Sequence, residues 1–224
     1  MSNLNYALSK IYNNLFIYFN YKQLVPIDEQ IEDSNFIENI FNNEYFIIRT
    51  ASNKYNDEEI NIIKENINNP KFSNNTLKIT YYIIFHYTSE IYSKTQELKK
   101  VLIKLKIIPF HYNIVLITKN GISTHVNTFI QSVKSKMSII NYPYKLFTII
   151  IPNHSLSNKH EILTDEESEH LLNNVLLCKK HNLPKIRLFD PQIIWSPGKL
   201  NDIVKITRHD DITCISIYYR VIIK

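Results

Sequence analysis

The chain has 224 residues, 44% hydrophobic and 21% charged, a composition typical of soluble globular proteins with one large domain or two small ones. It has only two glycines, Gly121 and Gly198, so it contains neither a P-loop nor a G-x-G-x-x-G motif, which excludes the nucleotide-binding enzymes that depend on them. The net charge of +5 is uneven: residues 90–149 carry nine basic and two acidic residues, a net of +7. Such a region is typical either of a surface that faces a polyanion or of a set of solvated helix faces.

The first third of the chain is predicted to be mainly helical. Apolar residues recur at helical spacing over Leu4–Phe19 and Asp28–Phe41. Asp57–Ile67 follows the same pattern and has acidic residues in its first turn, as the helix dipole favours. Tyr45–Arg49 is a short β-prone run. A loop is expected over residues 70–75, which include a proline and two consecutive asparagines.

The middle of the chain alternates between strand and helix patterns. Strands are predicted at Lys78–Tyr87, Tyr112–Thr118 and Lys145–Ile151, and helices at Ser89–Lys106 and Ile122–Lys136. Five of the nine lysines in the basic region lie on the first of these helices. A β-α-β-α-β order predicts a mostly parallel sheet with covering helices, an α/β domain.

The pattern changes after residue 150, where we place a domain boundary. Thr164 and Glu167 form a capping-box sequence that opens a helix to about Cys178. Asp190 before Pro191 predicts a second capped helix, a short one. Strands at 203–208 and 214–223, joined through a hairpin at 209–212, complete a small α+β domain. The predicted domains are 1–149 and 150–224.

No catalytic or metal centre is expected. Four histidines at positions 154, 160, 170 and 181 and Cys178 lack the spacing of a zinc site, so histidines that bond their own backbone turns are favoured. A magnesium-dependent nuclease needs an acidic residue on one strand and Asp/Glu-x-Lys on the next. The one relevant match, Glu97-Leu98-Lys99, falls inside a predicted helix, and no G-x-S-x-G elbow occurs. We therefore expect no cofactor and no bound metal.

The sequence contains few indications of the compartment or source of the protein. The longest apolar runs are too short to cross a bilayer, and the N-terminus lacks the pattern of a signal peptide, so no membrane contact is expected. Two cysteines, at positions 178 and 214, favour a reducing compartment. The bias toward Asn, Ile, Lys, Tyr and Phe is typical of an A/T-rich genome, such as that of a protist or a large DNA virus.

Residues 154–220 resemble the C-terminal domain of the fifth subunit of eukaryotic RNA polymerases and its archaeal counterpart. The family pattern has three parts: H-x-L-V-P-x-H-x-x-L-[ST]-x-x-E, then L-P-[RK]-I-x-x-x-D-P-V, then G-x-V-V-K-I-x-R with a closing Y-x-x-Y-R. The matching residues are His154, Leu156, His160, Leu163, Thr164, Glu167, Leu183, Pro184, Lys185, Ile186, Asp190, Pro191, Val204, Lys205, Ile206, Arg208, Tyr219 and Arg220. Three glycines of the family are replaced: by Pro197 and Asn201 in the turn before the third part, and by Cys214 in the hairpin.

The resemblance implies a non-catalytic subunit of a DNA-dependent RNA polymerase. Its C-terminal domain would dock on the largest subunit and neighbouring small subunits. The implied interface residues are His154, Leu156, His160, Pro184, Asp190, Pro191, Lys205, Arg208 and Arg220. Structural roles are favoured for Leu156, Pro184 and Pro191. Arg208 and Arg220 are expected to be exposed contacts, brought near each other by pairing of the last two strands.

For residues 1–149 the resemblance is weaker and implies a nuclease-like α/β jaw domain without catalytic residues, placed near downstream DNA. Its DNA-proximal residues would be Lys119, Asn120, Gly121, Ser123, Thr124 and His125. Binding to the duplex would be weak and independent of sequence. A cellular member would work in the nucleus, and a viral member in the virion and in viral factories of the host cytoplasm. A stand-alone nucleic-acid-binding protein and a nuclease-fold enzyme remain as alternatives.

Overall fold

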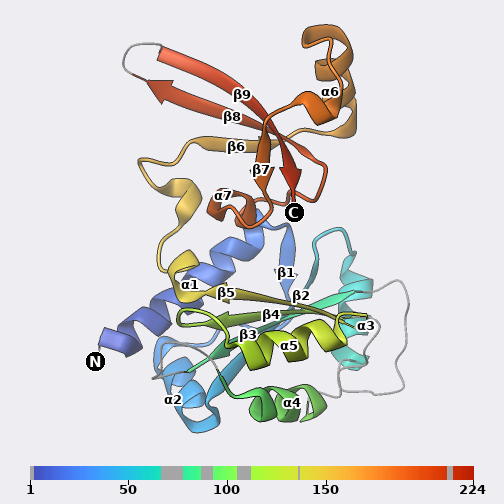
Figure 1. Ribbon diagram of the computed structural model, residues 1–224. Helices are drawn as coiled ribbons and strands as arrows, with labels where there is room; N and C mark the ends of the chain where they lie inside the picture. Colours follow the sequence, from blue (N-terminus) through green and yellow to red (C-terminus); the bar gives the residue numbers. More distant parts are fainter. Residues whose placement is uncertain (1–2, 67–77, 87–92, 105–111, 136, 211–213) are drawn as a thin grey trace. The chain divides into compact units, whose positions relative to one another are not determined.

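The computed structural model describes all residues except 1–2, 67–77, 87–92, 105–111, 136 and 211–213 (Figure 1). The loop expected over residues 70–75 therefore lies outside the described residues. The chain divides into two compact units, Met1–Thr148 (unit 1) and Ile149–Lys224 (unit 2). None of the described helices is long and apolar enough to cross a membrane.

Unit 1 is built on a five-stranded sheet in the order β1-β2-β3-β4-β5. The strands are β1 (Leu24–Pro26), β2 (Tyr45–Ser52), β3 (Ile79–Phe85), β4 (Tyr112–Thr118) and β5 (Ser138–Pro143). The pairs β3–β4 and β4–β5 are parallel, as the β-α-β order predicted. The pairs β1–β2 and β2–β3 are antiparallel, so the prediction of a mostly parallel sheet holds only for one half. The cause is β2, a β-prone run that joins the same sheet in the opposite direction.

The predicted strand over Lys145–Ile151 is wrong. This apolar run forms two 3-10 turns, Tyr144–Leu146 and Ile151–Asn153, and the third parallel strand is β5. The run is apolar because Leu146 and Phe147 are buried anchors. The Phe147 carbonyl accepts a hydrogen bond from Asn14 Nδ2 at 2.7 Å, so a side chain replaces the ladder partner that a strand would supply.

Helices cover both faces of this sheet (Figure 1). On one face lie α1 (Asn3–Tyr21) and α2 (Asp33–Asn43), which contact each other through Tyr12 and Phe36. Tyr12 with Phe46 and Phe19 with Tyr82 join α1 to the sheet. On the other face lie α3 (Asp57–Asn66), α4 (Thr95–Lys104) and α5 (Thr124–Val133), whose buried residues share a core with Tyr81, Ile83 and Phe85. Unit 1 is therefore a three-layer unit with helices on both faces of a mixed sheet, whereas the sequence predicted covering helices on a mostly parallel one.

Three of these helices are shorter than predicted, and one of them is α5, which was predicted over Ile122–Lys136 and runs from Thr124 to Val133. Within the predicted range Ser89–Lys106, α4 begins at Thr95, and Ser93 and Lys94 precede it without helical structure. The remainder of that range lies outside the described residues. The helix predicted from Asp28 begins at Asp33 because Asp28 holds Arg49 of β2: its carboxylate accepts bonds from the Arg49 backbone N–H at 2.6 Å and from Nε at 2.9 Å. An extended segment, not a helix, allows this pairing.

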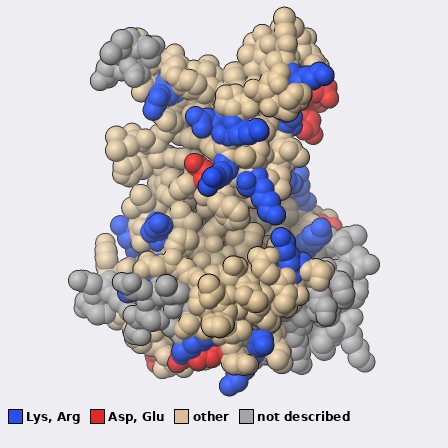
Figure 2. All heavy atoms as spheres, in the orientation of Figure 1, with Lys and Arg blue, Asp and Glu red and all other residues tan. Residues whose placement is uncertain are grey.

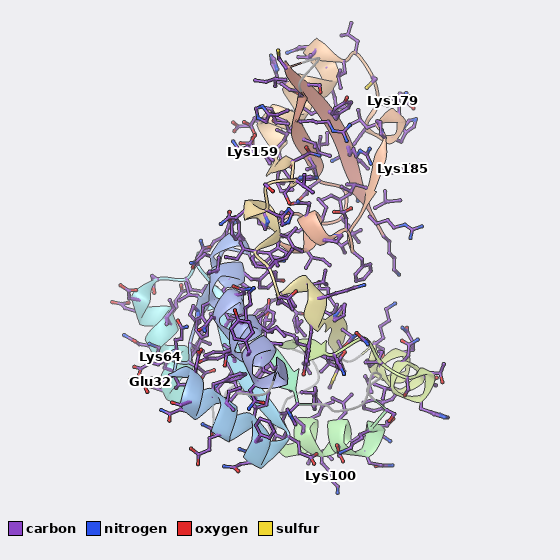
Figure 3. The ribbon with its side chains drawn as sticks, turned by 90° about the vertical axis from the view of Figure 1, so that its left-hand side faces the viewer. Glu32, Lys64, Lys100, Lys159, Lys179 and Lys185 are labelled. Carbon is purple, nitrogen blue, oxygen red and sulfur yellow. The ribbon has the colours of Figure 1, made fainter. Side chains whose placement is uncertain are left out.

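Unit 2 is an α+β unit with a four-stranded sheet in the order β6-β8-β9-β7. The strands are β6 (Lys159–Ile162), β7 (Lys185–Arg187), β8 (Ile203–Asp210) and β9 (Cys214–Ile223). Lys159 on β6 and Lys185 on β7 mark the two opposite edges of the sheet in Figure 3. The predicted strands are β8 and β9; the short edge strands β6 and β7 were not predicted.

Each face of this sheet has its own small core, covered by one short helix. α7 (Pro191–Ile194) packs Ile193 against Val204, Ile206 and Ile222 on one face. The other face packs Ile203 and Val221 against Leu171, which opens the π-helical turn Leu171–Val175 after α6 (Asp165–His170). We call these the α7 face and the α6 face. The helix predicted to reach Cys178 thus ends three residues early, in a π-helical turn.

Candidate interaction surfaces

The matching residues at the start of unit 2 form a turn that displays Leu156. The Leu156 N–H donates to Nδ1 of His154 at 3.2 Å, and the Ser157 hydroxyl donates to the Ile151 carbonyl at 2.5 Å. Leu156 is 86% exposed. The burial does not support the structural role expected for this leucine: most of its side chain is exposed in the described chain, and the turn holds it in solvent.

Both histidines of this region bond to their own backbone turns, as the sequence favoured. Nδ1 of His160 lies 2.8 Å from the Asn158 carbonyl, and His154 accepts from the backbone as described above. No group of three or more potential metal ligands occurs in the described residues. The geometry therefore assigns these two imidazoles to shaping the turn before β6.

The other structural candidates are divided. Asp190 caps α7, accepting from the Gln192 N–H at 2.9 Å, and Pro191 occupies the first helical position, as predicted. The capping box at Thr164 is also present, with both reciprocal bonds. Pro184 has an exposed ring, but its carbonyl accepts from the Val221 N–H at 2.9 Å and so fixes β7 against β9.

Arg208 and Arg220 are both exposed, as expected, but they do not adjoin each other. Arg208 pairs with Ser216 and Arg220 with Val204, so four residues of strand separate them, about 13 Å at the usual rise. Both side chains project from the α7 face, because paired residues share a face and every second residue returns to it. Neither arginine forms an ion pair within the described residues. The strand register thus shows that the two arginines share a face of the sheet, as predicted, but are not close to each other.

Lys205 projects from the opposite, α6 face, where it pairs across the ladder with Glu161. The pKa of Glu161 is lowered, first by its hydrogen bond from Lys159 and also by the charge of Lys205. Lys205 also lines a groove of about 420 Å³ between the sheet and α6. The other lining residues are Leu163, Glu166, Glu167, His170, Leu171, Val175 and Tyr219. The implied interface residues therefore occupy both faces of the sheet and do not form one patch.

Basic side chains predominate over acidic ones on the face of the molecule shown in Figure 2.

At two of the positions where the family has glycine, the backbone keeps a left-handed conformation: φ is 71° at Asn201 and 57° at Cys214. At Gly198 it is packing that requires glycine. A Cβ there would lie 2.7 Å from the Ile222 side chain, closer than packing allows.

The DNA-proximal candidates lie together on the connection from β4 to α5. Ser123 caps α5, accepting from the Val126 N–H at 3.4 Å, and Thr124 and His125 are exposed in the first turn. Asn120 is exposed and Lys119 is half-buried. The Thr118 hydroxyl lies 2.9 Å from Asn141 Oδ1 and 3.2 Å from the Gly121 carbonyl, which ties the connection to β5.

Beside this connection, α4 and α5 enclose an open groove of about 790 Å³. It is lined by Ser93, Lys94, Thr95, Gln96, Glu97, Lys99, His125, Thr128, Phe129 and Ser132. Lys94 is paired with Glu97 at 2.9 Å and with Glu44 at 3.3 Å, while Lys99 lies 5.1 Å from the Phe129 ring centre. Lys100 points away from the body of unit 1 (Figure 3). Among the described lining residues, hydroxyl and amine groups accompany a single carboxylate, that of Glu97, so these residues offer no carboxylate pair for a metal.

Comparison with known proteins decides the family. The family model described as "RNA polymerase Rpb5, C-terminal domain" matches residues 149–222. An archaeal RNA polymerase subunit Rpo5, from Archaeoglobus fulgidus, is 41% identical over 73 residues, which cover 95% of that protein. The chain belongs to the Rpb5 family of RNA polymerase subunits.

The similarity also extends through unit 1. A DNA-directed RNA polymerase RPB5 homolog of African swine fever virus, isolate Tick/Malawi/Lil 20-1/1983, is 26% identical over 219 residues, covering 97% of this chain and 98% of the viral protein. The Rpo5 subunit of Sulfolobus acidocaldarius matches only about a third of the chain, at 44% identity. The viral homologue is similar to both units of this chain, whereas the short archaeal subunits match unit 2 alone.

Sequence reasoning missed one group of exposed residues. Ile215, Ile217 and Tyr218 on the outer half of β9 are 58%, 48% and 47% exposed. The run I-S-I-Y-Y-R was interpreted only as a strand, and its apolar residues look like core positions. The one available signal was its place directly after the hairpin, at the far end of the strand from the buried Val221 and Ile222.

Proposed function

We propose that the chain is a non-catalytic subunit of a DNA-dependent RNA polymerase. Unit 2 docks on the largest subunit and neighbouring small subunits, and unit 1 forms the lower jaw beside downstream DNA. The observation that carries this proposal is the family match over residues 149–222 together with full-length similarity to viral RPB5 homologues. Because those full-length relatives are viral, we assign the chain to a viral transcription machinery in the virion and the host cytoplasm.

Two features of unit 2 support docking. Leu156 is an apolar side chain held in solvent by a hydrogen-bonded turn, and burying its apolar surface against a partner is favourable. Arg208 and Arg220 expose two guanidinium groups without ion pairs in the described residues. Carboxylates or carbonyls of a partner would satisfy them in the bidentate manner that arginine favours.

The chemistry of unit 1 supports a structural role. A nuclease of this architecture needs neighbouring carboxylates at strand ends to hold magnesium. Here β3 carries none, and Glu97 lies on α4 in an ion pair with Lys94. The exposed start of α5 instead offers backbone N–H groups and a helix dipole, which suit phosphate contacts of low specificity.

Affinity purification of the tagged chain from its native source tests the proposal. We expect stoichiometric recovery of the large polymerase subunits. Arg208→Glu with Arg220→Glu should reduce that recovery at least tenfold. Reversing the charge of an arginine that pairs with a partner's carboxylate in the buried interface costs more than about 1.4 kcal/mol. Lys54→Glu with Lys64→Glu, the same charge change on exposed residues of unit 1, is the matched control and should leave recovery intact.

Circular dichroism of the isolated chain must show that the double arginine variant folds. A folded variant that still recovers the polymerase removes both arginines from the interface. A wild-type chain that purifies without any large subunit contradicts the proposed function itself.

A further inference from the structure

The outer half of β9 has a strand on only one side. β8 pairs with β9 along Cys214–Val221, but β7 pairs only with Val221, Ile222 and Ile223. Within the described part of the chain, no strand lies against β9 between Cys214 and Arg220 on the side where β7 ends. Most of the length of β9 therefore has no described strand on the side where β7 pairs with its last three residues.

The backbone groups that face this empty position can be assigned from two hydrogen bonds. The Val221 N–H donates to Pro184 on the β7 side at 2.9 Å, and the Ile222 N–H donates to Asp202 on the β8 side at 3.0 Å. Peptide groups alternate in direction along a strand, so Ile215, Ile217 and Tyr219 direct their N–H and C=O groups toward the free edge. The five residues from Ile215 to Tyr219, about 17 Å of strand, form an edge ready for pairing.

The side chains along this edge are those of an interface. Ile215 and Ile217 are 58% and 48% exposed on the α6 face, next to the half-buried Tyr219. Proteins usually protect an exposed edge with lysine, proline or a bulge, because a free apolar edge recruits other strands. Residues 215–219 contain none of the protecting residue types. An unprotected apolar edge of this kind is expected where a partner covers it.

We propose that an extended segment of another polymerase subunit pairs with the β9 edge from Ile215 to Tyr219 and continues the sheet beside β7. This mode of binding takes its affinity from backbone hydrogen bonds and its specificity from alternate side chains. The inference rests on the proposed function, since it names how unit 2 engages its partner.

The two faces define the chemistry of the partner strand. On the α6 face its side chains lie beside Ile215 and Ile217, so they are apolar. On the α7 face they lie beside Tyr218 and Arg220, with Arg208 on the adjoining strand, so they are acidic or polar. A second copy of this chain fits less well, because its own residues 215–220 offer these arginines no acidic side chain.

Hydrogen–deuterium exchange resolved to single amides tests the pairing without any mutation. The full chain is compared free and in the assembled polymerase. In the free chain the amides of Ser216, Tyr218 and Arg220, directed at β8, should exchange more slowly than those of Ile215, Ile217 and Tyr219. In the polymerase the second set should slow by about tenfold or more. If the polymerase retains the chain and these three amides exchange as before, the pairing is wrong while the proposed function stands.

A pair of substitutions at one position separates backbone from side-chain binding. Ile217→Pro removes an edge-directed N–H and should lower recovery of the polymerase at least tenfold. Ile217→Thr keeps the N–H and the branched shape, so it should lower recovery far less. Equal loss with both variants overturns the pairing in favour of apolar contact alone. Failure of the wild-type chain to recover polymerase instead rejects the function on which the inference rests.

Discussion

Single backbone conformations in unit 2 show how residue type and local strain are connected. Asn201 and Cys214 both have positive φ, at 71° and 57°. Asparagine tolerates the left-handed region better than other residues with a side chain, and the Asn201 N–H also bonds to the Ile222 carbonyl at 2.9 Å. Cysteine has no such preference, so Cys214 holds a strained conformation next to the β8–β9 hairpin.

Cys214→Gly should therefore stabilise unit 2. Removing the Cβ from a left-handed position relieves about 1 kcal/mol, reduced by the greater flexibility of glycine in the unfolded chain. Urea denaturation of the full chain should show a higher midpoint. Ser216→Gly is the matched control: Ser216 is in the regular part of β9, and the same change should lower stability by about 0.5–1 kcal/mol. A lower midpoint for Cys214→Gly would show that the cysteine is unstrained.

At the scale of elements, the sequence predicts what local chemistry determines. The capping box at Thr164 and the Asp190–Pro191 start predict α6 and α7 because a cap needs only neighbouring residues. The strands β6 and β7 were missed because three or four residues carry no detectable alternation. After Pro143 the structure depends on tertiary packing. The apolar residues there, such as the buried Phe147, gave a turn the sequence pattern of a strand.

The start of α5 carries the prediction about DNA. Lys119→Ala with Ser123→Ala removes one charge and the cap from the connection between β4 and α5. If this connection faces the duplex, the dependence of complex stability on salt should fall by roughly one unit of log–log slope for each phosphate that is no longer bound. Dissociation of the assembled polymerase from template DNA between low and moderate salt measures this slope.

Lys134→Ala, at the opposite end of α5, provides the control for loss of a charge on the same helix. It should leave the slope unchanged, because its side chain lies away from the connection. A slope that is equal for the wild type and the double variant would mean that this part of unit 1 faces away from DNA.

For the molecule as a whole, the part of the candidate site that could be predicted from sequence lies mainly on one side of the division near residue 150. The matching residues of unit 2 were identified from sequence, but their distribution over two sheet faces required the strand register. The free edge of β9 could not be predicted, because it depends on how far the short β7 extends along its neighbour. Local motifs thus predicted the residues of the proposed interface, and long-range pairing determined their arrangement.

We predict that residues 149–224 fold without unit 1. They hold a complete four-stranded sheet, two capped helices and two small cores, although ~75 residues is close to the lower limit for an autonomous domain. The isolated unit should show one cooperative thermal transition. Thr164→Ala removes the cap of α6 and should cost about 1 kcal/mol, which lowers the transition by about 4–8 °C in a unit of this size. The same substitution in the full chain should cost the same free energy, because an autonomous unit does not depend on its neighbour. A non-cooperative transition of the isolated unit, or a much larger loss there than in the full chain, would show that unit 1 is needed for unit 2 to fold.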